Sequence, residues 1–193
     1  MHSFTGNLLV ASSLVTDPVY ARGVCLLVHQ DNENVIGVML NRPMQPNPEA
    51  MLQMFGQQNE VQNRLAPQVP TLANSLHFGG PLSGPVVAIH QLSQCAEAET
   101  GSGIYVAAQK HHLEQLVRDH PSPYRLIVGH LGWEKDQLEA EIQGGIWHSI
   151  PATADSVFSS SGDMWQRLIQ RATSNSMARW INIPDAIGAG ELN

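Results

Sequence analysis

The sequence predicts an α+β fold in a single domain. Its 193 residues fall within the roughly 100–200 of one domain, and no linker-like stretch divides them. Strand-like segments come first in hairpin-like succession and helical patterns concentrate later, which is typical of α+β rather than alternating β–α–β proteins. Hydrophobic residues make up 42% of the chain, enough for a sizeable core. We expect the domain to span residues 1–174 and a loosely ordered C-terminal tail to span residues 175–193.

The clearest predicted element is a β-hairpin. Residues 23–30 and 34–40 are nearly continuously apolar, and the polar residues 31–33 separate them. Because polar and apolar residues hardly alternate, we expect both faces of these strands to be covered. Residues 7–11 form a further predicted strand. Pro43 ends the hairpin, because proline cannot donate a hydrogen bond to a strand ladder.

The middle of the chain is predicted to contain short strands and two helices. Apolar residues at helical spacing predict a short helix over residues 48–55, followed by an exposed polar loop over residues 57–70. Further predictions, in chain order, are strands at 75–78 and 86–92, a loop at 97–103, a strand at 104–108 and a helix at 109–118.

Residues 124–147 form a predicted strand–turn–helix–strand unit. An apolar strand is followed by a turn at 129–133, a helix that ends at Gly144, and a second apolar segment. The length of the unit allows a parallel crossover between its strands. Trp133, Gln137 and Glu141 form one row along the helix. We interpret this row mainly as a solvated face with Trp133 over the core, and alternatively as one wall of a binding groove.

The last predicted elements are a turn region and a helix. Residues 153–161 are interpreted as a turn region. Ser160 or Ser161 is a candidate cap for a helix with an apolar stripe that includes Trp165 and Leu168. Helical periodicity ends after Ser174, which sets the predicted domain boundary.

Composition and charge restrict the classes of partner. The net charge is −7 and the 10 Lys and Arg residues form no basic run, which argues against non-specific binding to nucleic acids or anionic membranes. The sequence contains neither a signal-peptide pattern nor an apolar run of about 20 residues. We therefore expect a soluble cytoplasmic protein. Cys25 and Cys95 are expected to be reduced, although two cysteines leave a disulfide open.

Several motifs have both a functional and a structural interpretation. Gly79 and Gly80 follow a strand directly, so they either form an anion-binding nest or a tight turn that frees space for packing, and we favour the turn. Asp17, Arg22 and Arg42 lie near strand ends, where an Asp–Arg pair is more often a structural clamp than a site. Nine histidines are scattered without metal-ligand spacing, and no nucleophile–base motif stands out.

Taken in order, these motifs resemble the YqgE/AlgH family of bacterial cytoplasmic proteins. The resemblance covers residues 6–172 and rests on DPVYARGV at 17–24, VMLNRP at 38–43, HFGGPL at 77–82, GHLGWEKDQLEAEI at 129–142, and Trp147. It implies a largely antiparallel sheet bent into a pseudo-barrel and flanked by helices. It implies no established reaction. Some members carry the label of transcriptional regulator, which the acidic charge of this chain does not support as direct DNA binding.

These observations favour a non-enzymatic binding or regulatory protein with an unknown protein or small-molecule partner. No cofactor, metal site or catalytic residue is predicted. The predicted binding groove consists of Asn41, Arg42, His77, Gly79, Gly80, Pro81, Trp133 and Gln137. The alternative is a cofactor- or metabolite-binding enzyme that holds an anionic group at its Gly-Gly-Pro turn. A third hypothesis, direct DNA binding, requires salt-dependent retardation of duplex DNA.

Overall fold

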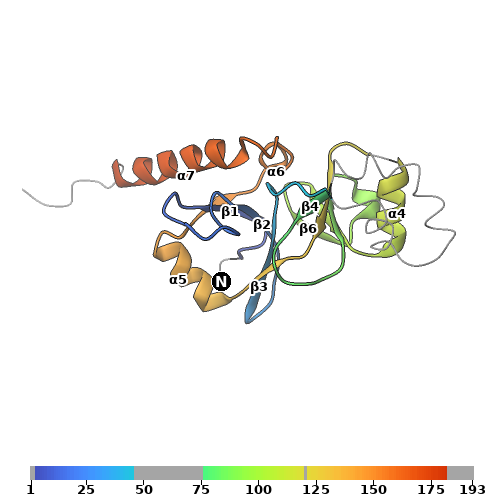
Figure 1. Ribbon diagram of the computed structural model, residues 1–193, viewed down its shortest axis with the longest axis horizontal. Coiled ribbons are helices and arrows are strands. Elements are labelled where there is room, and N and C mark those ends of the chain that lie inside the picture. The colour runs from blue at the N-terminus through green and yellow to red at the C-terminus, as the bar shows by residue number, and fades with distance from the viewer. Residues whose placement is uncertain (1–2, 46–75, 120, 182–193) are drawn as a thin grey trace, which may run out of the picture.

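The computed structural model describes residues 3–45, 76–119 and 121–181, with side chains described up to residue 174. Within these residues, two sheets pack face to face, with α5 on the outer side of the first and α4 on the outer side of the second (Figure 1). The first sheet has five strands in the order β10 (Trp147–Pro151), β1 (Asn7–Ala11), β2 (Val24–Gln30), β3 (Asn34–Met39) and β9 (Leu131–Glu134).

The second sheet has five strands in the order β4 (Leu76–Phe78), β8 (Tyr124–Val128), β5 (Val87–His90), β7 (Ile104–Ala107) and β6 (Ala98–Gly101). Within the described strands, only β4 and β8 pair in parallel. The α+β class and the largely antiparallel pairing are therefore confirmed. The single bent sheet is replaced by two sheets, which do not close into a barrel.

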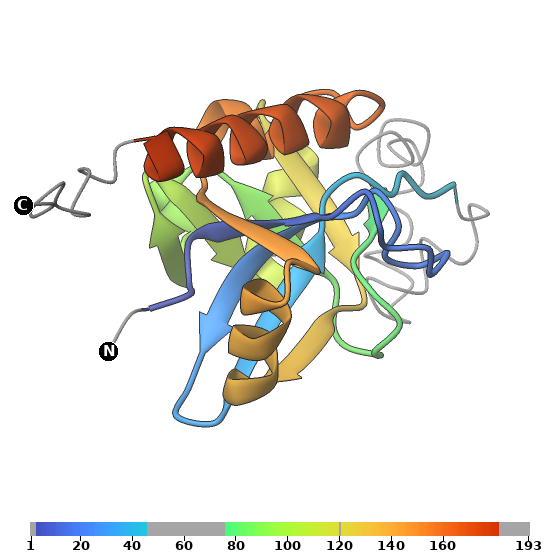
Figure 2. The same cartoon turned by 90° about the vertical axis from the view of Figure 1, so that its left-hand side faces the viewer.

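The described helices are α4 (Lys110–Asp119), α5 (Lys135–Gln143), α6 (Ala154–Val157) and α7 (Met164–Ile181), with a short 3₁₀ helix, η2, at Ser93–Cys95. Thr153 caps α6 through a capping box with Ser156. Helix α7 crosses the edge of the two-sheet core (Figure 2) and packs on β1 and β10. It continues beyond Ser174 to Ile181, so the predicted tail begins inside a helix.

The predicted hairpin is present as β2 and β3. Asp31 accepts hydrogen bonds from the backbone N–H groups of Glu33 and Asn34, which orders the turn. Leu26 faces the core between the two sheets, whereas Leu27 faces the layer that contains α5. Both faces are thus covered, as the missing alternation predicted.

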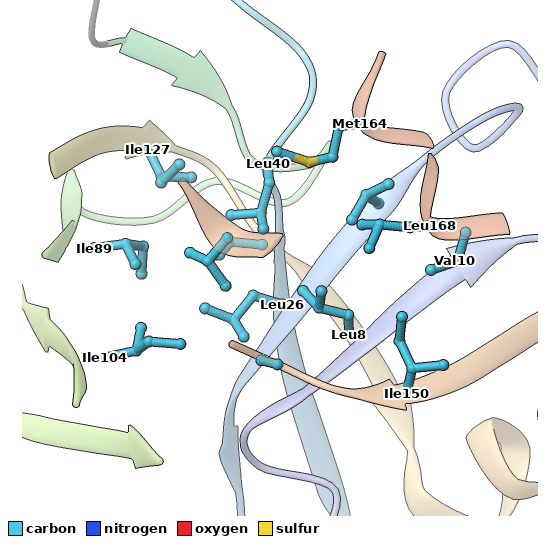
Figure 3. Packing of buried hydrophobic residues seen from close by; sticks show 14 of the residues in the cluster. Leu8, Val10, Leu26, Leu40, Ile89, Ile104, Ile127, Ile150, Met164 and Leu168 are labelled. Carbon is cyan, nitrogen blue, oxygen red and sulfur yellow. The ribbon is translucent and has the colours of Figure 1, made fainter. Parts of the chain in front are cut away.

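The core between the sheets joins segments that are distant in the chain. Leu26 of the first sheet, Ile127 of the second and Met164 of α7 point into one cluster, as Figure 3 shows. Each fully buried Leu or Ile side chain contributes about 1.5–3 kcal/mol. The cluster therefore fixes α7 and the second sheet against the hairpin.

Three predictions for individual segments were wrong. Residues 98–101, within the predicted loop at 97–103, form β6, and residues 131–134, within or next to the predicted turn at 129–133, form β9. Neither strand contains a continuous apolar run, because β6 has the sequence AETG and β9 has the sequence LGWE. The crossover within one sheet is also wrong, because β8 belongs to the second sheet and β10 to the first. The predicted helix at 48–55 and loop at 57–70 lie outside the described residues.

His90 supplies a prediction for the acid stability of the second sheet. Burial of its ring, together with the nearby His112, lowers the pKa of this imidazole. Because the folded state disfavours protonation of His90, this residue does not lower the stability above about pH 6.5. Its unfavourable contribution grows as the pH falls below that value. We expect His90→Leu to flatten the dependence of the urea midpoint on pH below about pH 6.5. An unchanged slope would contradict this role for His90.

Candidate functional site

Arginine side chains gather where the end of β3 meets the start of α7. Two adjoining cavities there share Pro43 and Ser161, and we call them together the arginine groove. The first has a volume of about 520 Å³ and is lined by Arg22, Asn41, Arg42, Pro43, Ser161, Gly162, Trp165 and Gln166. The second has a volume of about 380 Å³ and is lined by Pro43, His77, Ser122, Pro123, Tyr124, Arg125, Phe158, Ser159, Ser160 and Ser161.

Asn41 holds the loop that precedes β2. Its side-chain oxygen accepts a hydrogen bond from Val24 N at 3.0 Å, and its Nδ2 donates to Arg22 O at 2.8 Å. The Asn41 side chain is buried, so these bonds satisfy polar atoms that water does not reach. Asn41 therefore positions the backbone of the groove.

Arg42 is bound to backbone carbonyls of the same loop. Its Nη2 donates to Ala21 O at 2.6 Å and to Val19 O at 3.3 Å, and burial lowers the pKa of its guanidinium. Asp17 instead accepts from the backbone N–H groups of Val19 and Tyr20. The clamp predicted from the sequence is thus built from arginine and carbonyl groups, without an Asp–Arg ion pair.

Arg22 has a more accessible side chain. Its backbone φ angle is 56°, which belongs to the left-handed region that residues other than glycine seldom adopt. Its guanidinium lies 5.6 Å from the centroid of the Trp165 ring, within the range of a cation–π contact. Trp165 is held in turn by a hydrogen bond from its Nε1 to Ala11 O at 2.8 Å. The indole therefore orients an exposed arginine at the groove.

Arg125 is a buried residue that lines the second cavity. It is only 7% exposed, and it donates to the backbone carbonyls of Leu40, Val157 and Ser159. Its Nη1 also lies 2.6 Å from His77 Nε2 and 3.1 Å from Ser161 Oγ. Burial lowers the pKa of this guanidinium.

Ser161 and His77 resemble a nucleophile–base pair, because Ser161 Oγ lies 3.1 Å from His77 Nε2. A guanidinium can only donate, so the Nε2 lone pair of His77 accepts from Arg125. That lone pair is then not available to take the proton of Ser161, as a general base must. The arrangement favours binding over nucleophilic catalysis.

The three arginines carry positive charge that no carboxylate neutralises within the described part of the chain. The arginine ion pairs found there are Arg118 with Asp119 and Arg167 with Asp163, and all four side chains are exposed. The whole chain carries a net charge of −7. A local positive groove on an acidic protein is suited to an anion, because arginine binds carboxylate and phosphate groups in a bidentate manner.

The glycines of the Gly-Gly-Pro turn contact the protein's own backbone. Gly79 N donates to Val128 O at 2.7 Å, and side chains at Gly79 or Gly80 would overlap the carbonyls of Gly129 and His130. Pro81 is exposed beside them. The close approach that glycine permits therefore joins the motif at residues 77–82 to the motif at residues 129–142. The Gly79 N–H is already hydrogen-bonded within the protein.

Trp133 and Gln137 line a different cavity, about 330 Å³ in volume, with Glu141. Trp133 lies in β9, whereas the other two lie in α5. Of the predicted groove residues, Asn41, Arg42 and His77 line the arginine groove. The others do not line it: Gly79, Gly80, Pro81, Trp133 and Gln137. Arg125 and Ser161 also line the groove and were not among the predicted site residues. A lone cation inside the apolar strand at 124–128 was the available signal for Arg125.

Among the described residues, no group of three or more His, Cys, Asp or Glu side chains is placed to hold a metal ion. No described helix has the length and apolarity needed to cross a bilayer. Cys25 and Cys95 are free and buried, and burial raises the pKa of each thiol.

Comparisons with known proteins agree on one family. A model of the AlgH-like family matches residues 8–176. A UPF0301 protein of Chlorobium chlorochromatii is 30% identical over 187 residues, covering 95% of this chain and 93% of the relative. A UPF0301 protein of Thermobifida fusca is 30% identical over 183 residues, covering 88% and 87%.

Two solved structures share the fold. The solution structure of the AlgH protein from Pseudomonas aeruginosa has a TM-score of 0.67 at 19% identity, covering 100% of this chain and 99% of the other. The crystal structure of protein DIP2367 from Corynebacterium diphtheriae has a TM-score of 0.67 at 24% identity, covering 89% and 88%. At these identities the likeness concerns the fold.

Proposed function

Since this chain belongs to the AlgH-like family, we propose for it a function that rests on its own geometry: it is a non-enzymatic protein that binds an anionic small molecule in the arginine groove. The observation that carries the proposal is the convergence of Arg22, Arg42 and Arg125 on two adjoining cavities. No described carboxylate forms an ion pair with any of them.

The three arginines have different roles in this proposal. Arg42 and Arg125 are held by backbone carbonyls, so they are pre-organised and provide a fixed positive potential. Arg22 is exposed on the Trp165 ring and supplies the direct contact to the ligand. Ser161, which lines both cavities, adds a hydroxyl that can donate to an anionic oxygen.

A non-enzymatic role is favoured over the enzyme alternative by two contacts. Arg125 donates a hydrogen bond to the Nε2 lone pair of His77, which would otherwise be the base for Ser161. Gly79 N is bonded to Val128 O, which argues against the Gly-Gly-Pro turn as the anion site. We further propose that binding serves a regulatory role in the cytoplasm. Direct binding to nucleic acids is not part of this proposal, because the acidic chain carries no basic run.

The proposal predicts that an anion stabilises the protein through Arg22. We expect inorganic phosphate, pyrophosphate, citrate or ATP to raise the melting temperature, and Arg22→Gln to weaken binding of that anion about tenfold. Calorimetric titration measures the affinity. Arg118→Gln removes the same charge from α4 and should leave the affinity unchanged, because Arg118 lies outside both cavities.

Two outcomes would contradict the proposal. If none of the four anions binds at about 10 mM, the groove is not an anion site of useful affinity. If Arg22→Gln and Arg118→Gln weaken binding equally, the anion responds to overall charge and not to the groove. Hydrolysis of ATP or pyrophosphate that is lost in Ser161→Ala would favour the enzyme alternative.

A further inference from the structure

The cavity beside α5 is chemically opposite to the arginine groove. It has a volume of about 330 Å³ and is bordered by three aromatic side chains, Tyr20, Trp133 and Trp147. We call it the aromatic pocket. Its other lining residues are Val15, Asp17, Leu131, Gly132, Gln137, Glu141 and Ile146, so it includes two acidic side chains and no Lys, Arg or His.

The rings of Trp133 and Tyr20 each stand nearly perpendicular to the ring of Trp147. The centroids of Trp133 and Trp147 are 6.0 Å apart with an interplanar angle of 87°, and those of Tyr20 and Trp147 are 6.2 Å apart at 85°. Perpendicular rings form the corner of a box rather than a flat stack. The π faces of such rings carry partial negative charge, which attracts cations.

Glu141 holds the two indoles in this arrangement. Its Oε2 accepts from Trp133 Nε1 at 3.0 Å and from Trp147 Nε1 at 2.9 Å, and its Oε1 accepts from Gln137 Nε2 at 2.8 Å. All three donors are neutral. Among the described residues, no ion pair involves Glu141. Its negative charge therefore remains at the pocket without a cationic partner.

Asp17 adds a second negative charge at the same pocket. Its Oδ1 accepts from Val19 N at 2.8 Å and from Tyr20 N at 3.3 Å, which fixes the turn that carries Tyr20. These bonds also come from neutral donors. The aromatic side chain of Tyr20 and the carboxylate of Asp17 are thus presented by one short, ordered turn.

We propose that the aromatic pocket binds a small organic cation of the alkylated ammonium class. Such a cation has an apolar surface that matches the rings and a diffuse positive charge that complements both the π faces and the two carboxylates. A strongly hydrated metal ion fits poorly, because the pocket walls are largely apolar and Glu141 already accepts three hydrogen bonds. This pocket shares no lining residue with the arginine groove.

Choline and its uncharged isostere test the proposal directly. In 3,3-dimethylbutan-1-ol a carbon atom replaces the ammonium nitrogen, so shape is kept and charge is lost. We expect choline to produce saturable shifts in the indole N–H resonances of Trp133 and Trp147, and to bind at least about tenfold more tightly than the isostere. The resonance of Trp165, which lies in the arginine groove, should not shift.

Variants with matched controls connect the binding to the pocket. Tyr20→Leu removes a ring and keeps apolar volume, so it should weaken choline about threefold to tenfold. Asp17→Asn keeps an oxygen acceptor for the turn and should weaken choline about threefold. Asp136→Asn makes the same charge change on the exposed side of α5, outside the pocket, and should have no effect.

Three outcomes would overturn the proposal. They are equal binding of choline and the isostere, the absence of any saturable shift at about 50 mM choline, and equal weakening by Asp17→Asn and Asp136→Asn. The affinity for phosphate is a separate readout of the arginine groove. Failure of one site therefore does not imply failure of the other.

Discussion

Replacing Gly79 by alanine is expected to lower the free energy of unfolding by about 3 kcal/mol or more. A β-carbon at this position would overlap the carbonyl oxygen of Gly129 and a methyl group of Ile127. The backbone cannot move away easily, because Gly79 N donates to Val128 O at 2.7 Å and Gly79 O accepts from Met39 N at 2.8 Å. Urea denaturation followed by circular dichroism measures the loss.

The position of these bonds explains the size of the expected effect. Met39 ends β3 in the first sheet and Val128 ends β8 in the second, so Gly79 is hydrogen-bonded to both sheets. Gly162→Ala is the matched control, because a β-carbon there meets nothing within 4 Å. It should change stability by no more than about 0.5 kcal/mol. Similar urea midpoints for Gly79→Ala and Gly162→Ala would contradict this prediction, because they would show that the structure accommodates a β-carbon at position 79.

Replacing Arg125 by methionine is expected to cost about 3–5 kcal/mol. The substitution keeps much of the apolar stem but removes every donor. The carbonyls of Leu40, Val157 and Ser159 then lose the guanidinium that links the end of β3 to the segment around α6. Leaving buried acceptors without partners costs about 1–3 kcal/mol each, which exceeds the gain from removing a buried charge.

Two further variants make this prediction specific. Arg125→Lys retains the charge, but its single ammonium cannot reproduce the fork of donors, so we expect most of the loss to remain. Arg118→Met removes an exposed arginine from α4 and should change stability by less than about 0.5 kcal/mol. An Arg125→Met protein of unchanged stability would contradict this prediction. It would mean that water hydrogen-bonds the three carbonyls in place of the guanidinium, so that water enters the groove more freely than the contacts indicate.

The local sequence pattern was sufficient to predict the elements that contain many apolar residues. The hairpin of β2 and β3 and helix α4 were predicted near their observed bounds, because burial on both strand faces and the spacing of Leu113, Leu116 and Val117 are visible in the chain itself. The four-residue strands β6 and β9 were missed. Their pairing depends on β7 and β3, and neither AETG nor LGWE contains the continuous apolar run that marks the predicted strands.

The candidate sites were predictable only in part. Asn41, Arg42 and His77 were predicted to line a binding groove at strand ends, and all three line the arginine groove, whereas their role in binding stays a prediction. Glu141 was placed in one row with Gln137, and the hydrogen bond between these two follows from their i, i+4 spacing. The second indole, that of Trp147, comes from β10, and no helical row could predict it.

The sequence by itself determined the α+β class, the family and the strands whose two faces are both buried. The tertiary structure decided which strands share a sheet and which polar side chains share a cavity. His77 and Ser161 are 84 positions apart, and Leu40 and Arg125 are 85 positions apart. Hydrophobic burial is a property that each segment shows in its own pattern, whereas the convergence of separate segments depends on how the two sheets and α7 pack together.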